Sequence, residues 1–170
     1  MKAFFAGSFD PLTLGHLNLI RRASIMFDEV VVAVMVNPQK KSSLSKERRM
    51  KHLVTCTRHL TNVKVVEENG LTVKAALKHG CGVLVRGIRN GKDMDYEVEM
   101  EWYNHRLCPE IETVYYSTVP ELMHISSSRV KEMASYGQSL KGLVPEIIRA
   151  EVESLLLPSQ SIEELEGIDN

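Results

Sequence analysis

Cysteine is scarce in this sequence. The three cysteines, Cys56, Cys81 and Cys108, lie far apart, and no two of them form a C-x-x-C pair. An odd number of widely spaced cysteines argues against a disulfide framework and against a zinc site. This pattern of cysteines is typical of reduced thiols in a cytoplasmic protein.

Long apolar segments are also absent. The longest uninterrupted apolar run, VVVAVMV at residues 30–36, is far too short to cross a bilayer. Asp10 interrupts the N-terminal apolar stretch too early for a secretory signal peptide. These observations predict a cytoplasmic protein with no membrane partner.

Neither sign of charge is in clear excess. The 21 basic and 22 acidic residues give a formal net charge of −1, whereas broad nucleic-acid binding usually requires a basic excess. We therefore expect no nucleic-acid partner. Any anion that this protein binds must be held by a few focused cations.

The sequence does contain short β-branched runs that alternate with amphipathic stretches. The expected strands are Ala3–Ala6, Val30–Val36, Val63–Val66, Val83–Val85 and Thr113–Tyr116. The expected helices cover 16–27, 46–60, 72–79, 93–107, 127–136 and 145–157. This alternation predicts an α/β fold in which helices cover both faces of a five-stranded parallel sheet, with a C-terminal helical extension. We expect one domain over residues 1–157 and a disordered acidic tail over 158–170.

Polar segments follow the expected strands in turn. They are GSFDPLTLGH at 7–16, NPQKK at 37–41, ENGLT at 68–72, RGIRN at 86–90 and STVPELMHISSS at 117–128. The carboxyl ends of parallel strands meet at one rim of the sheet, where open α/β folds bind their ligands. We therefore expect a single ligand site at this rim.

The side chains expected at the rim suit phosphate. They are Lys40, Lys41, Arg86, Arg89, His16, Ser8, Ser126, Ser127 and Ser128. Backbone N–H groups at the helix starts near His16 and Ser127 would add partial positive charge. The set has no nucleophile beside an obvious base and no cluster of metal ligands. It favours transfer to phosphorus, in which positioning and charge stabilisation supply most of the catalysis.

Each of these residues also has a purely structural interpretation. His16 shares the inward stripe of its helix and fits a hydrogen-bonded, buried histidine, while the serine run fits a helix N-cap. The two arginines fit ion pairs with Asp93 or Glu97, and the lysine pair fits a solvated loop. The acid-rich segment 93–103 fits an exposed helical face better than a metal site. The joint occurrence of these residues at one rim is what favours function.

The sequence resembles a known family at several points. Thr13-Leu14-Gly15-His16 resembles the (T/H)xGH signature that adenylyltransferases, cytidylyltransferases and class I aminoacyl-tRNA synthetases share. The segments RASIMFD, NPQKK, RGIRNGKDMDYE, PEIETV and ISSSRVKE occur in the order and spacing of bacterial phosphopantetheine adenylyltransferases. The resemblance covers residues 2–157, and the positions that depart from the family pattern are Leu14, Gly70, Leu122 and His124.

This resemblance implies a fold, a reaction and an assembly. It implies a Rossmann-like, doubly wound nucleotidyltransferase fold that assembles as a homohexamer. It also implies that ATP and 4′-phosphopantetheine give dephospho-coenzyme A and pyrophosphate with Mg²⁺, the penultimate step of coenzyme A biosynthesis. It identifies no protein side chain as a metal ligand.

Residue roles also follow from the resemblance, position by position. The catalytic positions are His16, as transition-state stabiliser, Lys40 and Arg89. The phosphopantetheine positions are Ser8, Lys40, Thr72 and Arg86. The ATP positions are Ser8, Phe9, His16, Gly87, Ile88, Arg89, Glu97, Leu122, Met123, His124, Ile125, Ser126, Ser127 and Ser128.

Two alternatives stay open at the level of sequence. Another nucleotidyltransferase, acting on nicotinamide mononucleotide or glycerol phosphate, would share the signature, although RGIRNGKDMDYE and ISSSRVKE favour the pantetheine enzyme. A non-catalytic, nucleotide-sensing α/β module would share the fold, since fold alone does not determine function. Such a module would bind ATP and release no pyrophosphate with any acceptor.

Overall fold

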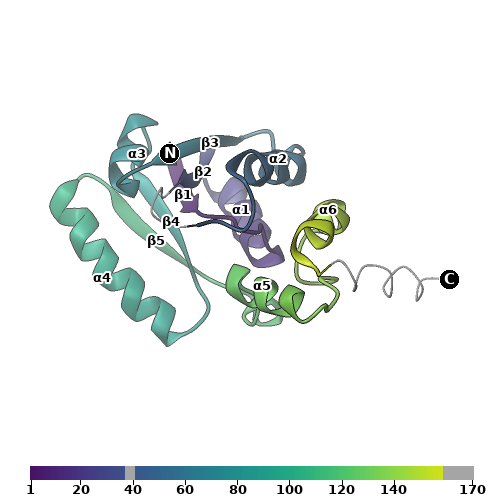
Figure 1. Ribbon diagram of the computed structural model, residues 1–170. Coiled ribbons are helices and arrows are strands. Elements are labelled where there is room, and N and C mark those ends of the chain that lie inside the picture. Colours follow the sequence, from purple (N-terminus) through teal and green to yellow (C-terminus); the bar gives the residue numbers. More distant parts are fainter. Residues whose placement is uncertain (37–40, 159–170) are drawn as a thin grey trace.

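One parallel sheet organises the computed structural model, which describes residues 1–36 and 41–158. The strands are β1 Lys2–Gly7, β2 Glu29–Val36, β3 Val63–Asn69, β4 Val83–Ile88 and β5 Glu112–Ser117. They pair in parallel in the order β3-β2-β1-β4-β5 (Figure 1). This order is that of a doubly wound, Rossmann-like sheet, so the predicted fold is confirmed.

Two strands extend further than their apolar residues indicate. β3 continues through Glu67–Asn69 because its backbone pairs with Val34–Val36 of β2. β4 continues to Ile88 because it pairs with β5 as far as Ser117. The prediction that the segment 86–90 follows its strand is therefore wrong for its first three residues, which lie inside β4.

Helices form where the sequence predicts them, with ends that shift by a few residues. They are α1 Leu14–Met26, α2 Lys46–Thr57, α3 Thr72–Lys78, α4 Gly91–Leu107, α5 Ser127–Ser135 and α6 Glu146–Leu156, with a short 3-10 helix, η1, at Pro120–Leu122. Four of these helices begin at an N-cap residue whose side-chain oxygen accepts a hydrogen bond from the backbone N–H three residues later. These N-caps are Thr13, Ser45, Asn90 and Ser126.

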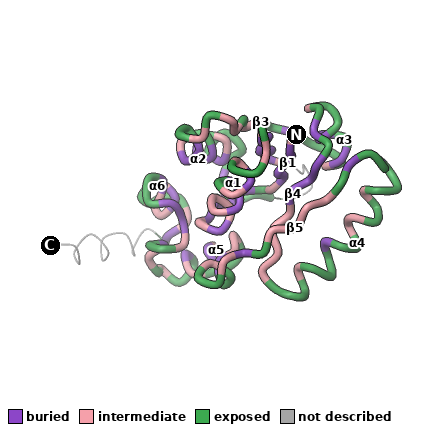
Figure 2. The backbone as a smooth tube through the Cα atoms, turned by 180° about the vertical axis from the view of Figure 1, so that it is seen from behind, coloured by how far each residue is buried: buried purple, intermediate pink, exposed green. Residues whose placement is uncertain are grey.

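The sheet separates two apolar cores, because successive side chains of a strand point to opposite faces. Phe5 and Val32 lie in the larger core, to which α1, α2, α5 and α6 contribute. Phe4 and Val31 lie in the smaller core, against α3 and the turn at Cys108–Ile111. Figure 2 shows the strands between these helical layers, which confirms that helices cover both faces.

Helix α4 lies beside the edge strand β5 and is mostly exposed (Figures 1 and 2). Among its residues, Glu97 alone is buried, whereas Val98, Trp102 and Tyr103 are 46%, 56% and 50% exposed. The acid-rich segment 93–103 therefore belongs to a mostly exposed helix, as its structural interpretation predicts, although Glu97 points inwards. The first turns of α4 stand over the end of β4, and this places them beside the site.

The strand order reverses between β1, the central strand of the sheet, and its neighbour β4. At such a switch point the connections leave in opposite directions and open a crevice at the carboxyl ends of the strands. Helix α1 packs closely on β4 at this crevice, through Leu19 and Gly87. A Cβ atom at Gly87 of β4 would lie 2.3 Å from Leu19 Cδ1 of α1, so any side chain at position 87 would require Leu19 to move.

A membrane span requires a helix of sufficient length and apolarity. Among residues 1–36 and 41–158, no helix combines the length and the apolarity needed to cross a lipid bilayer.

Candidate active site

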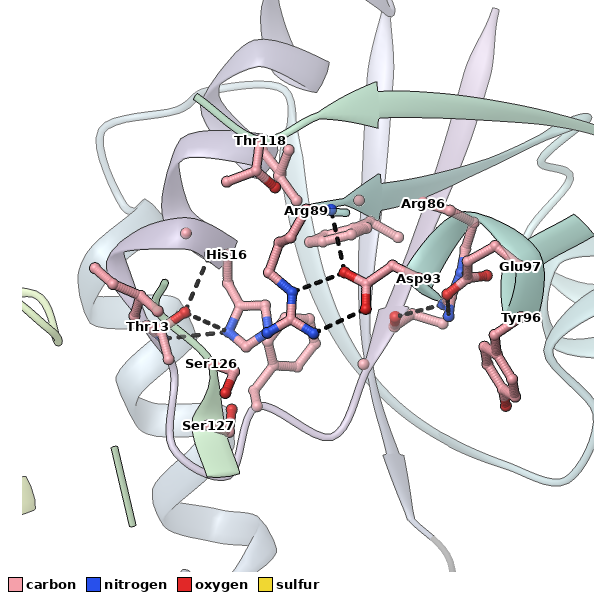
Figure 3. Close-up of a pocket in the computed structure, with 18 of the residues that line it drawn as sticks. Thr13, His16, Arg86, Arg89, Asp93, Tyr96, Glu97, Thr118, Ser126 and Ser127 are labelled. Carbon is pink, nitrogen blue, oxygen red and sulfur yellow. Dashed lines mark hydrogen bonds and ion pairs between the residues drawn. The ribbon is translucent and has the colours of Figure 1, made fainter. Parts of the chain in front are cut away.

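A cavity of about 390 Å³ opens at the rim of the sheet, between the starts of α1, α4 and α5. It brings together many of the residues that the sequence predicts for a site (Figure 3). These residues are Phe9, His16, Arg86, Gly87, Arg89, Glu97, Ile125, Ser126 and Ser127. The expectation of a ligand site where the strands end therefore agrees with the position of this cavity.

Other predicted residues do not line this cavity. They are Ser8, Lys41, Thr72, Ile88, Leu122, Met123, His124 and Ser128, and Lys40 lies outside the described residues. Ser8 has an exposed side chain, and its carbonyl oxygen accepts a hydrogen bond of 2.8 Å from the buried Arg49. Their roles in substrate binding stay predictions.

The cavity also has lining residues that were not predicted as site residues. They are Thr13, Lys92, Asp93, Tyr96 and Thr118, besides the apolar Phe5, Ala6, Gly7, Gly15 and Leu19. Lys92, Asp93 and Tyr96 recur at helical spacing in front of Glu97, which is a sequence signal for one helix face. Thr118 directly follows β5 and lies in the rim segment 117–128 that the sequence identified, although the sequence predicted no individual role for it.

His16 is held by the helix start in which it lies. The Thr13 hydroxyl accepts the His16 backbone N–H at 3.3 Å, and the Thr13 backbone N–H donates to His16 Nδ1 at 3.2 Å, which completes a capping box. The Thr13 hydroxyl also lies 3.1 Å from Nδ1. Because Nδ1 accepts, the proton of the neutral ring is on Nε2. His16 thus offers the cavity an N–H donor, as its predicted role as transition-state stabiliser requires.

The ring of His16 is neutral at physiological pH. Burial, and secondarily the positive charge of Arg89, lower the pKa of His16 from 6.5 to about 4. The Phe9 ring packs edge-on against it, with ring centroids 5.2 Å apart. A neutral ring whose Nε2 already carries a proton cannot accept another proton at that atom, so the geometry disfavours a general base there.

Two ion pairs hold the cationic wall of the cavity. Arg86 donates from Nε and Nη2 to the two oxygens of Glu97 at 2.7 and 2.6 Å. Arg89 donates from Nε and Nη2 to Asp93 at 2.8 and 3.0 Å. The structural interpretation of these arginines is therefore confirmed, yet both also line the cavity, so ion pairing and ligand binding are compatible here.

Hydroxyl groups and a helix N-terminus form the wall opposite the arginines. The Ser126 side chain accepts the Arg129 N–H at 3.1 Å and caps α5. The Ser127 hydroxyl donates to the Pro11 carbonyl at 2.8 Å, which ties α5 to the loop after β1. The first N–H groups of α5 thus lie at the cavity, where they favour a bound anion.

Neither a bare metal centre nor a reactive thiol is found at the site. Within the described part of the chain, no three His, Cys, Asp or Glu side chains form a group that could hold a metal ion. The three cysteines are free and buried, and burial raises the pKa of Cys56 to about 11.

Comparison of sequences identifies relatives over most of the chain. Residues 4–133 match the cytidylyltransferase-like family. A phosphopantetheine adenylyltransferase of Streptococcus pneumoniae is 45% identical over 151 residues, which cover 88% of this chain and 93% of the relative. One from Thermosynechococcus vestitus is 44% identical over 164 residues, which cover 94% of this chain and 98% of the relative.

Comparison of structures supports the fold. A Vibrio parahaemolyticus protein described as a nicotinate-nucleotide adenylyltransferase superposes with a TM-score of 0.65 at 15% identity, over 89% of this chain and 90% of that one. A lipopolysaccharide core biosynthesis protein from Thermoplasma volcanium superposes with a TM-score of 0.52 at 21% identity, over 69% and 97% of the two chains. At these identities the likeness concerns the fold alone.

Proposed function

The chain belongs to the phosphopantetheine adenylyltransferases within the cytidylyltransferase-like family, and we propose that it transfers the adenylyl group of ATP to 4′-phosphopantetheine. The phosphate of phosphopantetheine attacks the α-phosphorus of ATP. A new P–O bond forms, the bond between the α-phosphorus and the bridging oxygen breaks, and pyrophosphate leaves. The products are dephospho-coenzyme A and pyrophosphate, so the enzyme catalyses the penultimate step of coenzyme A biosynthesis.

The attacking phosphate needs no general base. The second pKa of a phosphate monoester is about 6, so the nucleophile is mostly a dianion at neutral pH. Repulsion between this dianion and ATP is the obstacle, and cations that hold both substrates reduce it. Arg86, Arg89 and Lys92 of the cavity wall, together with Lys40, supply this positive charge.

Each wall of the cavity has its own task in this proposal. His16 donates its Nε2–H to the α-phosphate as charge shifts there in the transition state. Arg89 acts beside it on the ATP side, whereas Arg86 and Lys40 hold the phosphate of phosphopantetheine. The N-terminus of α5, with Ser126 and Ser127, receives ATP phosphates. The other predicted positions, Thr72 among them, would contact the remaining parts of the two substrates.

Mg²⁺ is the proposed cofactor. Magnesium is commonly bound through substrate phosphates and water, with few protein ligands. The described residues fit this mode because Asp93 and Glu97, the carboxylates at the cavity, are both engaged by arginines. When bound to ATP, the ion would offset negative charge on the phosphates.

We also propose a cytoplasmic homohexamer. Helix α4 exposes several neighbouring apolar side chains, including Val98, Trp102 and Tyr103. A monomer usually exposes such residues singly, whereas a group of them marks an interaction surface. Burial of such a face between copies of the chain would remove it from water. The free, buried cysteines agree with a reducing compartment.

The cavity carries the functional proposal. It places a neutral N–H donor, two arginines and a helix N-terminus around one space at the switch point of the sheet. This combination suits a reaction in which an oxyanion is positioned and no proton has to be removed.

A substrate panel tests the proposal. The protein is incubated with ATP, Mg²⁺ and one acceptor, and pyrophosphate release is measured for 4′-phosphopantetheine, nicotinamide mononucleotide, nicotinate mononucleotide and glycerol 3-phosphate. Of these acceptors, we expect only 4′-phosphopantetheine to give pyrophosphate release, together with formation of dephospho-coenzyme A. Preference for another acceptor would identify a different nucleotidyltransferase, and ATP binding without release for any acceptor would identify a nucleotide sensor.

A further inference from the structure

We propose that Asp93 is a positioning residue, which holds the Arg89 guanidinium in the orientation that adenylyl transfer uses. This inference rests on the proposed function for its kinetic consequences. Asp93 lies in the first turn of α4, lines the cavity and faces Arg89 there (Figure 3).

Three hydrogen bonds join these two residues. Arg89 Nε and Nη2 donate to the two Asp93 oxygens at 2.8 and 3.0 Å, and the Arg89 backbone N–H donates to Asp93 Oδ2 at 3.1 Å. A carboxylate that binds both the guanidinium and the backbone of one residue restricts the torsions between them. Such a bidentate pair sets an orientation as well as a charge.

The pairing leaves a defined set of donors for the substrate. A guanidinium carries five N–H groups, and Asp93 engages the edge formed by Nε and Nη2. The Nη1 donors and the second Nη2 donor remain, and no described residue accepts from Nη1. Arg86 differs because its Nη1 also donates to the Ala6 carbonyl at 3.2 Å. Arg89 is therefore the arginine with more donors available to the cavity.

Asp93 itself is held in place by the helix it begins. Its backbone N–H donates to the Asn90 side chain at 3.1 Å, the N-cap bond of α4. The N-terminus of a helix favours a carboxylate, and Arg89 lowers the pKa of Asp93 further. Asp93 is thus charged at physiological pH, and its position depends on α4 and does not depend on a ligand.

A second interpretation makes the opposite prediction. If Asp93 only competed with ATP for Arg89, loss of its charge would release the arginine and improve ATP binding. If Asp93 positions Arg89, loss of its charge lowers turnover and leaves ATP binding nearly unchanged, because the oriented arginine acts as charge develops in the transition state. The two interpretations are separated by turnover and affinity measured on the same variant.

The kinetic experiment uses Asp93→Asn, Arg89→Ala and the double variant. We expect Asp93→Asn to lower kcat about 10- to 100-fold, as loss of orientation typically does, with the dissociation constant for ATP changed by less than about threefold. In the Arg89→Ala background the same substitution should have no further effect, because Asp93 acts through Arg89. Effects that multiply in the double variant, or tighter ATP binding by Asp93→Asn, would overturn the proposal.

A matched control exists on the same helix. Asp95 is exposed and does not line the cavity, so Asp95→Asn makes the same chemical change beside the site. We expect this variant to retain wild-type kcat. An equal loss in both variants would mean that α4 is merely weakened, which would also overturn the proposal.

A second readout needs no substrate and survives even if the proposed reaction is wrong. The positive charge of Arg89 contributes to the low pKa of His16, so an NMR titration of the His16 ring reports where the guanidinium lies. If Asp93→Asn lets Arg89 swing away, the pKa of His16 rises. An unchanged or lower pKa in Asp93→Asn would show that Arg89 stays without Asp93 and would refute the positioning role. If the wild-type protein does not act on 4′-phosphopantetheine and the titration shift appears, the functional proposal alone fails.

Discussion

The carboxylate of Asp10 joins the loop after β1 to the segment before α2 and to α5, and its removal should be costly. Asp10 is 5% exposed, and its oxygens accept the backbone N–H groups of Ser43 at 2.9 Å and Leu44 at 2.8 Å. Lys131 of α5 donates to the same carboxylate at 3.3 Å. Replacement by Ala removes every one of these interactions without adding bulk.

The magnitude follows from what is left behind. The Leu44 residue is buried, so its N–H would lose its partner away from water, at about 1–3 kcal/mol. The Ser43 residue is exposed, and water would restore part of its bond, so its share is about 1 kcal/mol. Lys131 is one-third exposed and adds at most about 1 kcal/mol. Asp10→Ala should therefore lower the free energy of unfolding by about 2–5 kcal/mol.

Urea denaturation of Asp10→Ala and Asp10→Asn measures this cost. We expect the Asn variant to lose about half as much, because its amide keeps one acceptor oxygen for the two N–H groups. Asp95→Ala and Asp95→Asn are the matched controls and should change stability by less than about 0.5 kcal/mol. A loss below about 1 kcal/mol in Asp10→Ala, or a loss equal to the control, would refute this reasoning.

Three further predictions concern the cavity. In the pyrophosphate-release assay, His16→Ala should lower turnover by about 10²–10³-fold, whereas His16→Asn and His16→Gln, which keep an N–H donor, should retain more turnover than His16→Ala. An equal loss of turnover in all three variants, with ATP binding intact, would count against the donor role. The pKa of His16 is lowered from 6.5 to about 4, so the unfolded state takes up a proton first and the free energy of unfolding falls as the pH drops from 6.5 towards 4, by up to about 3 kcal/mol. His16→Gln should lack this contribution, and curves of unfolding free energy against pH that run parallel for the variant and the wild type would contradict the burial argument. Gly87→Ala would bring a Cβ to 2.3 Å from Leu19 Cδ1 and should cost about 1–3 kcal/mol in thermal denaturation; Gly82→Ala, which meets nothing within 4 Å, is its control, and equal effects would contradict the packing argument.

Local patterns in the sequence were sufficient for the elements and for the place of the site. Apolar runs such as Val30–Val36 predict buried strands, and Thr13 and Ser126 cap helices within three residues of themselves. Because parallel strands end at one rim, the order of elements already brings His16, Arg86 and Ser126 to one side of the sheet. These features depend on interactions between near neighbours or on a general property of α/β folds, so the sequence determines them.

Pairing between distant side chains was decided by the tertiary structure. The sequence allows Arg86 and Arg89 either Asp93 or Glu97 as a partner, and the position of α4 over β4 assigns Glu97 to the first and Asp93 to the second. The bonds from Ser43 and Leu44 to Asp10 cross more than thirty residues of chain. No periodicity records such contacts, because they depend on how elements lie in space. The sequence therefore determined which segments meet at the rim, and the packing of α4 and α5 around the crevice determined which of their side chains line the cavity and which of them touch.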